Sequence, residues 1–289
     1  MYSSGTTGIS KGIVNTHYAR SNFASMTALE FRIDITSISL VTTPMYTNAT
    51  WMTMLPTFLV GGTLVVMPSF DPLKFLEIAQ AERTTHTFMV PTQYYVILNH
   101  PDFDKYDVSS FKYMISAAAP LRQDTKREIV KRFGCGLMEL YGLTEGIGST
   151  LKPEDIHRKT TSVGSPVAGC DIRIIDNGGK ELPRGEIGEI IGYSPLLMKE
   201  YYKQPEKTAD AIWLDEMGRT YLKTGDLGKL DEDGFLYILD RKKDMIISGG
   251  INIYASDIEE IISKHPAVVD SAVIAPFPMT SGSRRPWHW

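Results

Sequence analysis

"GGTLVVMPSFDPLKFLEIAQAERTTHTFMVP", residues 61–91, contains one complete strand–helix–strand unit. Residues 61–68 and 85–91 are short apolar runs, which are typical of buried strands. Between them, Asp71 and Pro72 predict the start of a helix, because a capping side chain is followed by proline at the first helical position. Two strands joined through a helix favour a parallel sheet, so this segment predicts an α/β fold.

The same alternation continues on both sides of this unit. Residues 51–68 predict a helix, a turn and a strand, since proline and a glycine pair interrupt a stretch too broken to span a membrane. Residues 111–120 predict another strand, and Asp124 is expected to cap a helix that ends at Gly134. We therefore expect layers of helix and sheet over residues 1–162.

The pattern changes from about residue 163. Short apolar runs separated by turn residues predict hairpins over 170–195, and Asp233-Gly234 marks another hairpin turn. Residues 163–240 are thus expected to form a small antiparallel β subdomain of barrel type. Residues 241–279 are expected to begin a small α+β C-terminal domain, and residues 280–289 form an atypical tail without periodicity.

Composition narrows the class of protein. The chain has 289 residues, 43% hydrophobic and 22% charged, which is ordinary for a globular protein with a real core. Its net charge of −4 argues against a nucleic-acid or anionic-membrane binder. No signal peptide precedes the first motif, and the two cysteines, Cys135 and Cys170, form no paired motif. These features predict a location in the cytoplasm.

Residues 2–12, "YSSGTTGISKG", are rich in glycine and hydroxyl groups and carry one lysine. Such a segment can wrap a polyphosphate through its backbone N–H groups, with Lys11 supplying a positive charge. It is not the common nucleotide P-loop, because Ser10, Lys11 and Gly12 stand where that motif needs glycine, lysine and a hydroxyl. From composition alone, phosphate binding and a plain surface loop both stay open.

Three other segments are ambiguous when taken singly. "YGLTE" (141–145) offers a ring, a hydroxyl and a carboxylate, which suit a base, a phosphate and Mg²⁺, or simply a turn at a strand end. "TGD" (224–226) is either a ribose-binding turn or an ordinary hairpin turn. "DRKKD" (240–244) is either a phosphate site at Arg241 or a solvated charged face.

Taken together and in order, these motifs resemble the adenylate-forming (AMP-binding) superfamily of acyl-CoA synthetases, peptide-synthetase adenylation domains and beetle luciferase. The resemblance runs from Tyr2 to about Pro276 and looks most like a bacterial acyl-CoA synthetase. It also includes "VPT" (90–92), "ISAAAPL" (115–121), "ELYGLTE" (139–145), "YLKTGD" (221–226) and "LDRKKDMIISGGINI" (239–253). Each motif is weak alone, but the ordered set is specific.

The resemblance implies a partial large domain, made of αβ sheet layers plus a small β-barrel, with the start of a small C-terminal domain. It also implies a site for ATP or AMP. The loop residues closing over the phosphates would be Ser3, Ser4, Gly5, Thr6, Thr7, Gly8 and Lys11. The remaining nucleotide contacts would be Ala118, Ala119 and Pro120 on one face of adenine, Tyr141 on the other face with Gly142 beside it, Thr144 at the α-phosphate, Asp226 at the ribose and Arg241 at the ribose or phosphate.

By the same resemblance, Glu145 would bind Mg²⁺ and Lys243 would be the hinge between the large and small domains. The catalytic set would be Thr6, Lys11, Thr144, Glu145 and Arg241. The acyl pocket is less well marked, because Thr47 stands where the family has a histidine. Tyr46, Asn48 and Ala117 are the pocket residues we expect.

The implied chemistry has two steps and belongs to fatty acid metabolism. A carboxylate attacks the α-phosphate of ATP, which releases pyrophosphate, and the thiol of coenzyme A then displaces AMP from the acyl-adenylate. Two alternatives stay open: an enzyme that loads a carrier protein or forms an amide, and an inactive nucleotide-binding remnant. Neither the acid nor the oligomeric state is indicated.

The ends of the chain carry a further expectation. Members of the superfamily have a long segment before the phosphate loop, and they continue beyond the position of Pro276 to a lysine that bridges carboxylate and phosphate. The resemblance therefore predicts that this chain is a fragment, and that these 289 residues alone do not complete the reaction.

Overall fold

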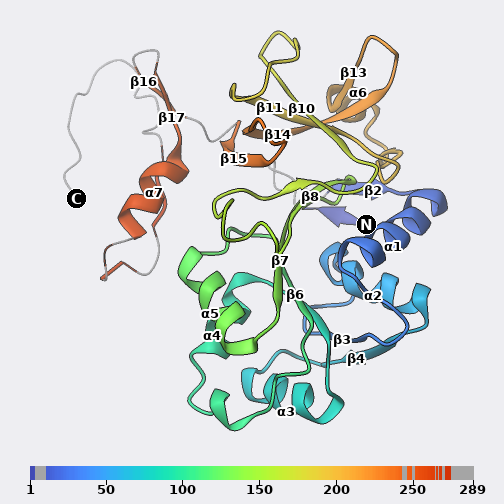
Figure 1. The fold of residues 1–289 in the computed structure, drawn as a ribbon. Helices are drawn as coiled ribbons and strands as arrows, with labels where there is room; N and C mark the ends of the chain where they lie inside the picture. The colour runs from blue at the N-terminus through green and yellow to red at the C-terminus, as the bar shows by residue number, and fades with distance from the viewer. Residues whose placement is uncertain are drawn as a thin grey trace.

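The computed structural model describes residues 1–3, 11–242, 246–248, 251–263, 265, 267–268 and 271–274 (Figure 1). Its largest element is a seven-stranded sheet in the order β4-β3-β5-β6-β7-β8-β9. The strands are β3 Ile38–Val41, β4 Thr63–Val66, β5 His86–Met89, β6 Tyr113–Ser116, β7 Gly136–Leu143, β8 Ile147–Leu151 and β9 Ser165–Pro166. Pairing is parallel from β4 to β7 and antiparallel from β7 to β9, which confirms the predicted α/β class.

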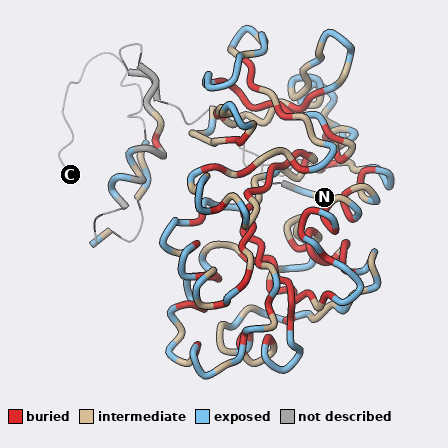
Figure 2. The backbone as a smooth tube through the Cα atoms, in the orientation of Figure 1, coloured by how far each residue is buried: buried red, intermediate tan, exposed pale blue. Residues whose placement is uncertain are grey.

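Helices cover both faces of this sheet, and Figure 1 shows α4 and α5 across β6 and β7 from α1 and α2. The helices are α1 His17–Glu30, α2 Asn48–Val60, α3 Pro72–Glu82, α4 Pro91–Leu98 and α5 Gln123–Phe133, with a short 3₁₀ turn at Phe103–Lys105. Consecutive strand residues enter opposite cores: Met114 packs with α3, α4 and α5, whereas Ile115 packs with α1 and α2. Burial on both faces explains why these strands are apolar runs without alternation (Figure 2).

The helix boundaries test two predicted caps. The side chain of Asp71 accepts a hydrogen bond from the backbone N of Lys74 at 2.8 Å, so the predicted start of α3 at Pro72 is confirmed. Asp124 is not the cap of α5, because that helix begins at Gln123 and Asp124 lies inside its first turn. There the carboxylate pairs with Arg127 at 3.0 Å and complements the helix dipole.

A second, antiparallel sheet contains the hairpins predicted from turn residues. Its strands are β10 Asp171–Ile175, β11 Gly188–Tyr193, β13 Ile212–Leu214, β14 Thr220–Leu230 and β15 Leu236–Arg241, with helix α6 at Pro205–Asp210. β10 pairs with β11 and β14 pairs with β15, as expected from the turns after residue 175 and at Gly234. The domain boundaries after residues 162 and 240 stay predictions.

The remaining described strands form two small units. β1 Tyr2–Ser3, β2 Lys11–Val14 and β12 Glu200–Tyr201 make a three-stranded sheet, and β16 Ile246–Ser248 pairs with β17 Ile251–Ile253. Helix α7, Ala255–Ser263, begins where the backbone N of Ala255 donates to Asp240 Oδ2 at 2.7 Å. None of the described helices combines the length and apolar character that a bilayer crossing requires.

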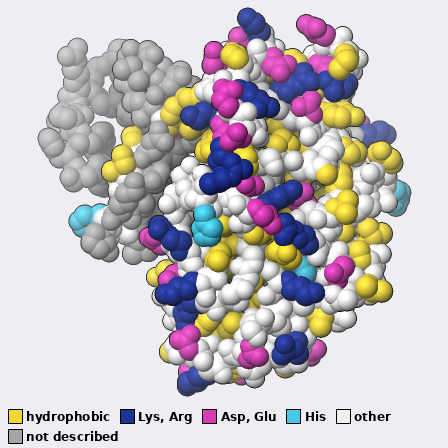
Figure 3. Space-filling model, viewed as in Figure 1, with side chains coloured by type: hydrophobic (Ala, Val, Ile, Leu, Met, Phe, Trp, Pro, Cys, Tyr) yellow, Lys and Arg dark blue, Asp and Glu magenta, His cyan; other side chains and the backbone are white. Residues whose placement is uncertain are grey.

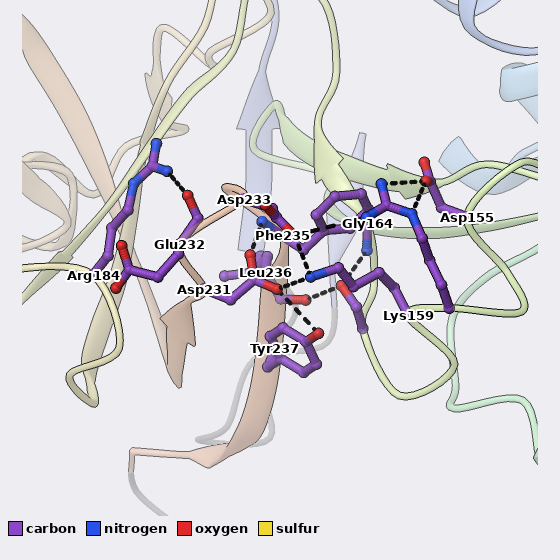
Figure 4. Close-up of polar contacts among 12 residues, drawn as sticks. Asp155, Lys159, Gly164, Arg184, Asp231, Glu232, Asp233, Phe235, Leu236 and Tyr237 are labelled. Atoms are coloured by element: carbon purple, nitrogen blue, oxygen red, sulfur yellow. Dashed lines mark hydrogen bonds and ion pairs between the residues drawn. The ribbon is translucent and has the colours of Figure 1, made fainter.

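Polar contacts tie the antiparallel sheet to the segment that follows β8 (Figure 4). Lys159 Nζ lies 2.6 Å from Asp231 Oδ2 and 2.7 Å from Asp233 Oδ2, in the turn between β14 and β15. The backbone N of Leu236 donates to the carbonyl of Gly164 at 2.8 Å. Gly164 has a φ of +89°, and a Cβ there would lie 1.9 Å from the backbone of Thr150, so only glycine fits this close approach.

Charged side chains of both signs are interspersed on the face drawn in Figure 3, in keeping with the small net charge. One ion pair differs because it is buried. Lys126 of α5 and Glu139 of β7 pair with side chains 9% and 7% exposed. Glu139 Oε1 also accepts from the backbone N of Leu121 at 3.2 Å, and Lys126 Nζ donates to the carbonyl of Thr160 at 3.0 Å. The pair therefore joins α5 and β7 to the loop at Leu121 and to the segment at Thr160.

Replacing Lys126 by methionine should leave the Glu139 carboxylate buried without a cation. We expect Lys126→Met to lower the free energy of unfolding by about 3–5 kcal/mol, because an uncompensated buried charge keeps its desolvation cost. Lys131→Met is the matched control, since this lysine of the same helix has a side chain 78% exposed. Urea denaturation measures both, and equal midpoints for the two variants would contradict a structural role for the buried pair.

Candidate functional site

The site begins where parallel strands end at a common edge. Ser116, the last residue of β6, pairs with Glu139, so the chain leaves β6 while β7 continues to Leu143. This register places residues 117–121 beside residues 141–145, bringing together two segments that lie about twenty residues apart. Ligands of open α/β sheets bind at the carboxyl edge of the parallel strands.

The three residues predicted to face adenine are exposed at this edge. Ala118, Ala119 and Pro120 follow β6 directly, and Ala118 has a φ of +75°. A left-handed conformation costs roughly 1–2 kcal/mol in a residue with a side chain, so the surrounding structure imposes it. Backbone strain of this kind is concentrated at ligand-binding sites, which supports the predicted role of the loop.

Tyr141 and Asp226 come together although 85 residues separate them in the sequence. The phenol of Tyr141 donates to Asp226 Oδ2 at 2.7 Å, and the backbone N of Asp226 donates to Thr224 Oγ1 at 3.0 Å. Arg241 is paired with Asp226 across β14 and β15, and its Nε lies 3.9 Å from Asp226 Oδ1. The structure thus brings the predicted base-stacking ring, the ribose acceptor and one cation into a single cluster.

Burial sets the protonation preferences of this cluster. Burial raises the pKa of the Asp226 carboxyl, while the hydrogen bond from Tyr141 and the charge of Arg241 oppose that shift. The pKa of Tyr141 is raised well above its usual value by burial and by the neighbouring Asp226 carboxylate. Tyr141 therefore stays a hydrogen-bond donor to Asp226 at physiological pH.

The predicted metal ligand is held by an aromatic residue from another sheet. Glu145 is 7% exposed, and the hydroxyl of Tyr201 donates to its Oε1 at 2.8 Å. Lys11 Nζ lies 4.7 Å from the centre of the Tyr201 ring. Burial and the Glu145 carboxylate raise the pKa of Tyr201, so its hydroxyl remains a donor. Thr144 stands half-buried beside Glu145 in the turn between β7 and β8, after the exposed Gly142.

The donor set around Glu145 fits Mg²⁺, which prefers oxygen ligands and keeps several waters. Among the residues that the structure describes, no group of three His, Cys, Asp or Glu side chains is placed to hold a metal. An ion at Glu145 would therefore complete its coordination with phosphate oxygens and water rather than with a cage of side chains.

Part of the predicted phosphate loop can be placed. Ser3 of β1 pairs with Lys11 of β2, so the two ends of the loop are held side by side. The predicted loop residues between them, Ser4, Gly5, Thr6, Thr7 and Gly8, lie outside the described residues, as does the predicted hinge Lys243. Arg241 is described and has a side chain 65% exposed.

A cavity of about 200 Å³ adjoins this cluster. Thr144 and Gly142 line it together with Asn48 and Ala117, two of the three predicted pocket residues. Tyr46 does not line it, because this residue precedes the start of α2 and is 82% exposed. Thr47, at the family's histidine position, is the N-cap of α2 and accepts from the backbone N of Thr50, so it has a structural role.

Sequence reasoning missed the largest contribution to the cavity. Helix α1 presents Arg20, Phe23, Thr27 and Glu30 to it. No motif marks this helix. The spacing of its apolar residues indicates only that one face is buried. The signal in the sequence is a charged residue on that face, since charged residues are seldom buried without a function or a partner.

Comparison with known proteins identifies the class. Residues 1–202 match the AMP-binding enzyme family. The chain is 34% identical over 281 residues to the medium/long-chain-fatty-acid–CoA ligase FadD8 of Mycobacterium tuberculosis, covering 94% of this chain and 47% of that protein. It is 35% identical over 277 residues to a feruloyl-CoA synthase of Amycolatopsis, covering 95% of this chain and 55% of that protein.

Solved structures agree. The amide bond synthetase McbA from Marinactinospora thermotolerans superposes with a TM-score of 0.85 at 31% identity, covering 96% of this chain and 56% of that chain. The o-succinylbenzoate-CoA synthetase MenE from Bacillus subtilis, in complex with ATP and magnesium, superposes with a TM-score of 0.84 at 31% identity. The match covers 95% of this chain and 56% of that chain.

The family match covers more than half of the chain, so this protein is a member of the AMP-binding enzymes, the adenylate-forming superfamily that its motifs indicated. The chain spans about half the length of the curated relatives it matches.

Replacing Asp226 by asparagine tests its predicted contact with the ribose. We expect Asp226→Asn to weaken AMP binding by roughly 1–1.5 kcal/mol, because asparagine keeps a neutral acceptor where the carboxylate makes a charge-assisted hydrogen bond to a ribose hydroxyl. Isothermal titration calorimetry measures this loss. Asp210→Asn, an exposed position in α6, is the control and should bind AMP normally.

The same substitution should change how stability depends on pH. Because burial raises the pKa of Asp226, the folded state binds this proton more tightly than the unfolded state. The stabilising contribution of the carboxyl is thus complete at low pH and is lost as pH rises through its titration. The melting temperature of Asp226→Asn relative to the unsubstituted protein should therefore increase from acidic to neutral pH. A constant difference across that range would contradict the raised pKa.

Proposed function

We propose that this protein, as part or whole of an AMP-forming acid–thiol ligase, activates a carboxylic acid with ATP and Mg²⁺ and passes the acyl group to coenzyme A. One observation carries the proposal. The carboxyl edge of the parallel sheet gathers the Ala118–Pro120 loop, the Tyr141–Glu145 segment and Asp226, and the 2.7 Å hydrogen bond from Tyr141 to Asp226 closes the cluster. These are the residues that the superfamily motifs assign to adenine, phosphate, metal and ribose.

In this proposal each residue has a separate task. Adenine lies between the Ala118–Pro120 backbone and the ring of Tyr141, and Asp226 accepts from the ribose hydroxyls. Thr144 contacts the α-phosphate, and Arg241 and Lys11 supply positive charge to the ribose–phosphate region. Gly142 keeps the surface beside adenine free of a side chain. Ser3 to Gly8 and the hinge Lys243 keep their predicted roles as proposals.

In this chemistry the protein forms no covalent bond to the substrates; it positions them and stabilises the developing charge. The acid carboxylate attacks the α-phosphorus of ATP, and pyrophosphate leaves with the electrons of the broken P–O bond. Mg²⁺ at Glu145 would neutralise charge on the phosphates, while Thr144 and the cations hold the reacting groups in line. In the second step a thiolate attacks the acyl carbon and AMP leaves.

Relatives support coenzyme A as the acceptor, because both curated relatives described above are named as CoA-forming enzymes. A second acceptor also has an observation in its favour. The amide bond synthetase McbA is similar over nearly the whole chain, so an amine is the alternative nucleophile for the same acyl-adenylate. A location in the cytoplasm and a role in fatty acid metabolism stay predictions.

The proposal is tested by acid-dependent pyrophosphate release. The full-length protein that contains this chain is incubated with ATP, Mg²⁺ and a panel of fatty, aromatic and short-chain acids. We expect at least one class of acid to release pyrophosphate, and AMP to appear when coenzyme A is added. If AMP appears only with an added amine, the amide-forming alternative is correct. If none of the acids causes pyrophosphate release, the proposal that this protein activates an acid is wrong.

Tyr201 gives a separate test of the metal site. Since its hydroxyl donates to Glu145 and orients it, we expect Tyr201→Phe to raise the Mg²⁺ concentration needed for half-maximal pyrophosphate release by roughly tenfold, the usual effect of removing a hydrogen bond to a metal ligand. AMP affinity measured without Mg²⁺ should be unchanged. Tyr202→Phe is the control, because the Tyr202 side chain is exposed. If Tyr201→Phe and Tyr202→Phe show the same Mg²⁺ dependence, Tyr201 does not position Glu145 as a metal ligand.

A further inference from the structure

Helix α1 lines the cavity with a charged residue at each end of one face. Arg20 and Glu30 are ten residues apart, which is about 15 Å along a helix. Between them Phe23, Met26 and Thr27 face the cavity, so most of this wall is apolar. A cavity that is apolar along its length and polar at its ends suits a ligand with the same distribution.

Glu30 is the unusual group in this wall. Its side chain is 6% exposed, and its Oε1 is buried without a hydrogen bond. Lys152 Nζ lies 3.4 Å from the same oxygen as an ion pair, with a side chain 40% exposed. A carboxylate can accept about four hydrogen bonds, and leaving a buried acceptor unbonded costs free energy. Glu30 therefore keeps unused acceptor capacity inside the protein.

Two elements show which end of the cavity Glu30 occupies. Lys152 follows the last residue of β8, whereas Thr144 and Glu145 lie in the turn before the first residue of that strand. Arg20, at the other end of α1, donates to Met1 Sδ at 3.1 Å, beside the start of the predicted phosphate loop, and Glu30 lies about 15 Å further along the helix. Arg20 also donates to Asn48 Oδ1 at 2.8 Å. The reacting end of the cavity is thus the end with Thr144, and Glu30 marks the far end.

We propose that Glu30 selects acids that carry a hydroxyl group at the end remote from the carboxyl. This inference rests on the proposed function, because it assumes that the cavity holds the acid. The hydroxyl would donate to the Glu30 carboxylate and satisfy the acceptor that the protein leaves unbonded. A neutral donor fits better than an ammonium group, since Lys152 already balances the carboxylate charge. A methyl group in the same place would leave Glu30 Oε1 desolvated and without a hydrogen bond.

The expected selectivity is substantial. A hydrogen bond to a charged group corresponds to roughly a 10- to 100-fold difference in affinity between a hydroxylated acid and its methyl analogue. A purely structural Glu30–Lys152 pair would give no such difference, because it would not respond to the end group of the ligand. The two explanations are therefore distinguished by matched ligands.

The experiment measures binding of two matched pairs of acids by calorimetry. The pairs are para-hydroxycinnamate with para-methylcinnamate, and omega-hydroxydecanoate with undecanoate. In the unsubstituted protein, the hydroxylated member of at least one pair should bind roughly 10- to 100-fold more tightly. Glu30→Leu should abolish or reverse that preference. Glu30→Gln, which keeps the shape and one acceptor oxygen, should retain a smaller preference and serves if the leucine variant does not fold. Glu82→Leu, at an exposed glutamate of α3 away from the cavity, is the control and should keep the preference.

Three results would overturn the inference: equal affinity within both pairs, a preference that survives in Glu30→Leu, or no binding of any of the four acids. AMP binding measured on the same protein reports on the proposed function independently. Normal AMP binding with no hydroxyl preference would reject the role of Glu30 and leave the nucleotide site standing. Absence of AMP binding would instead count against the proposed function.

Discussion

The parallel register between β6 and β7 is the constraint on which the site depends. Because β6 ends opposite Glu139, the loop after Ser116 must leave the sheet beside the part of β7 that continues to Tyr141. Glu139 then secures that loop by accepting from the backbone N of Leu121, while its buried pairing with Lys126 anchors α5 against the same strand. A shift of this register would separate the two segments and disrupt the proposed nucleotide-binding cluster.

The second sheet completes what the first begins. β14 places the Asp226 carboxylate where it accepts from the Tyr141 hydroxyl, and the contacts of Lys159 with the turn after β14 hold the two sheets together. The close approach at Gly164 leaves no room for a side chain, so one glycine permits this docking. Burial of Asp226 raises its pKa and works against stability at neutral pH, which is the usual cost of holding a charged group ready for a ligand.

The cavity at the proposed acyl end of the site also contains charged groups in buried surroundings. Apolar side chains of α1, α2 and β7 line most of it, and two charged residues, Arg20 and Glu30, interrupt that lining. Arg20 has its pKa lowered by burial, and Glu30 lacks a hydrogen-bond donor at one oxygen. A buried charge lowers the stability of the protein unless a partner or a ligand pairs with it. The positions of these two charges therefore indicate which ligand groups the cavity can bind, which the superfamily motifs do not.

The sequence by itself determined the class of fold, most strands and helices, and the superfamily, because hydrophobic spacing, turn residues and ordered motifs are local properties of the chain. Local competition explains its error at Asp124, where a pairing with Arg127 inside the helix replaced the expected cap. Only the tertiary structure decided that Tyr46 lies outside the cavity while Glu30 lies inside it. It alone also joined Tyr141 to Asp226 and Glu145 to Tyr201. These contacts are long-range: they arise from strand register and sheet docking, which no local pattern of residues encodes.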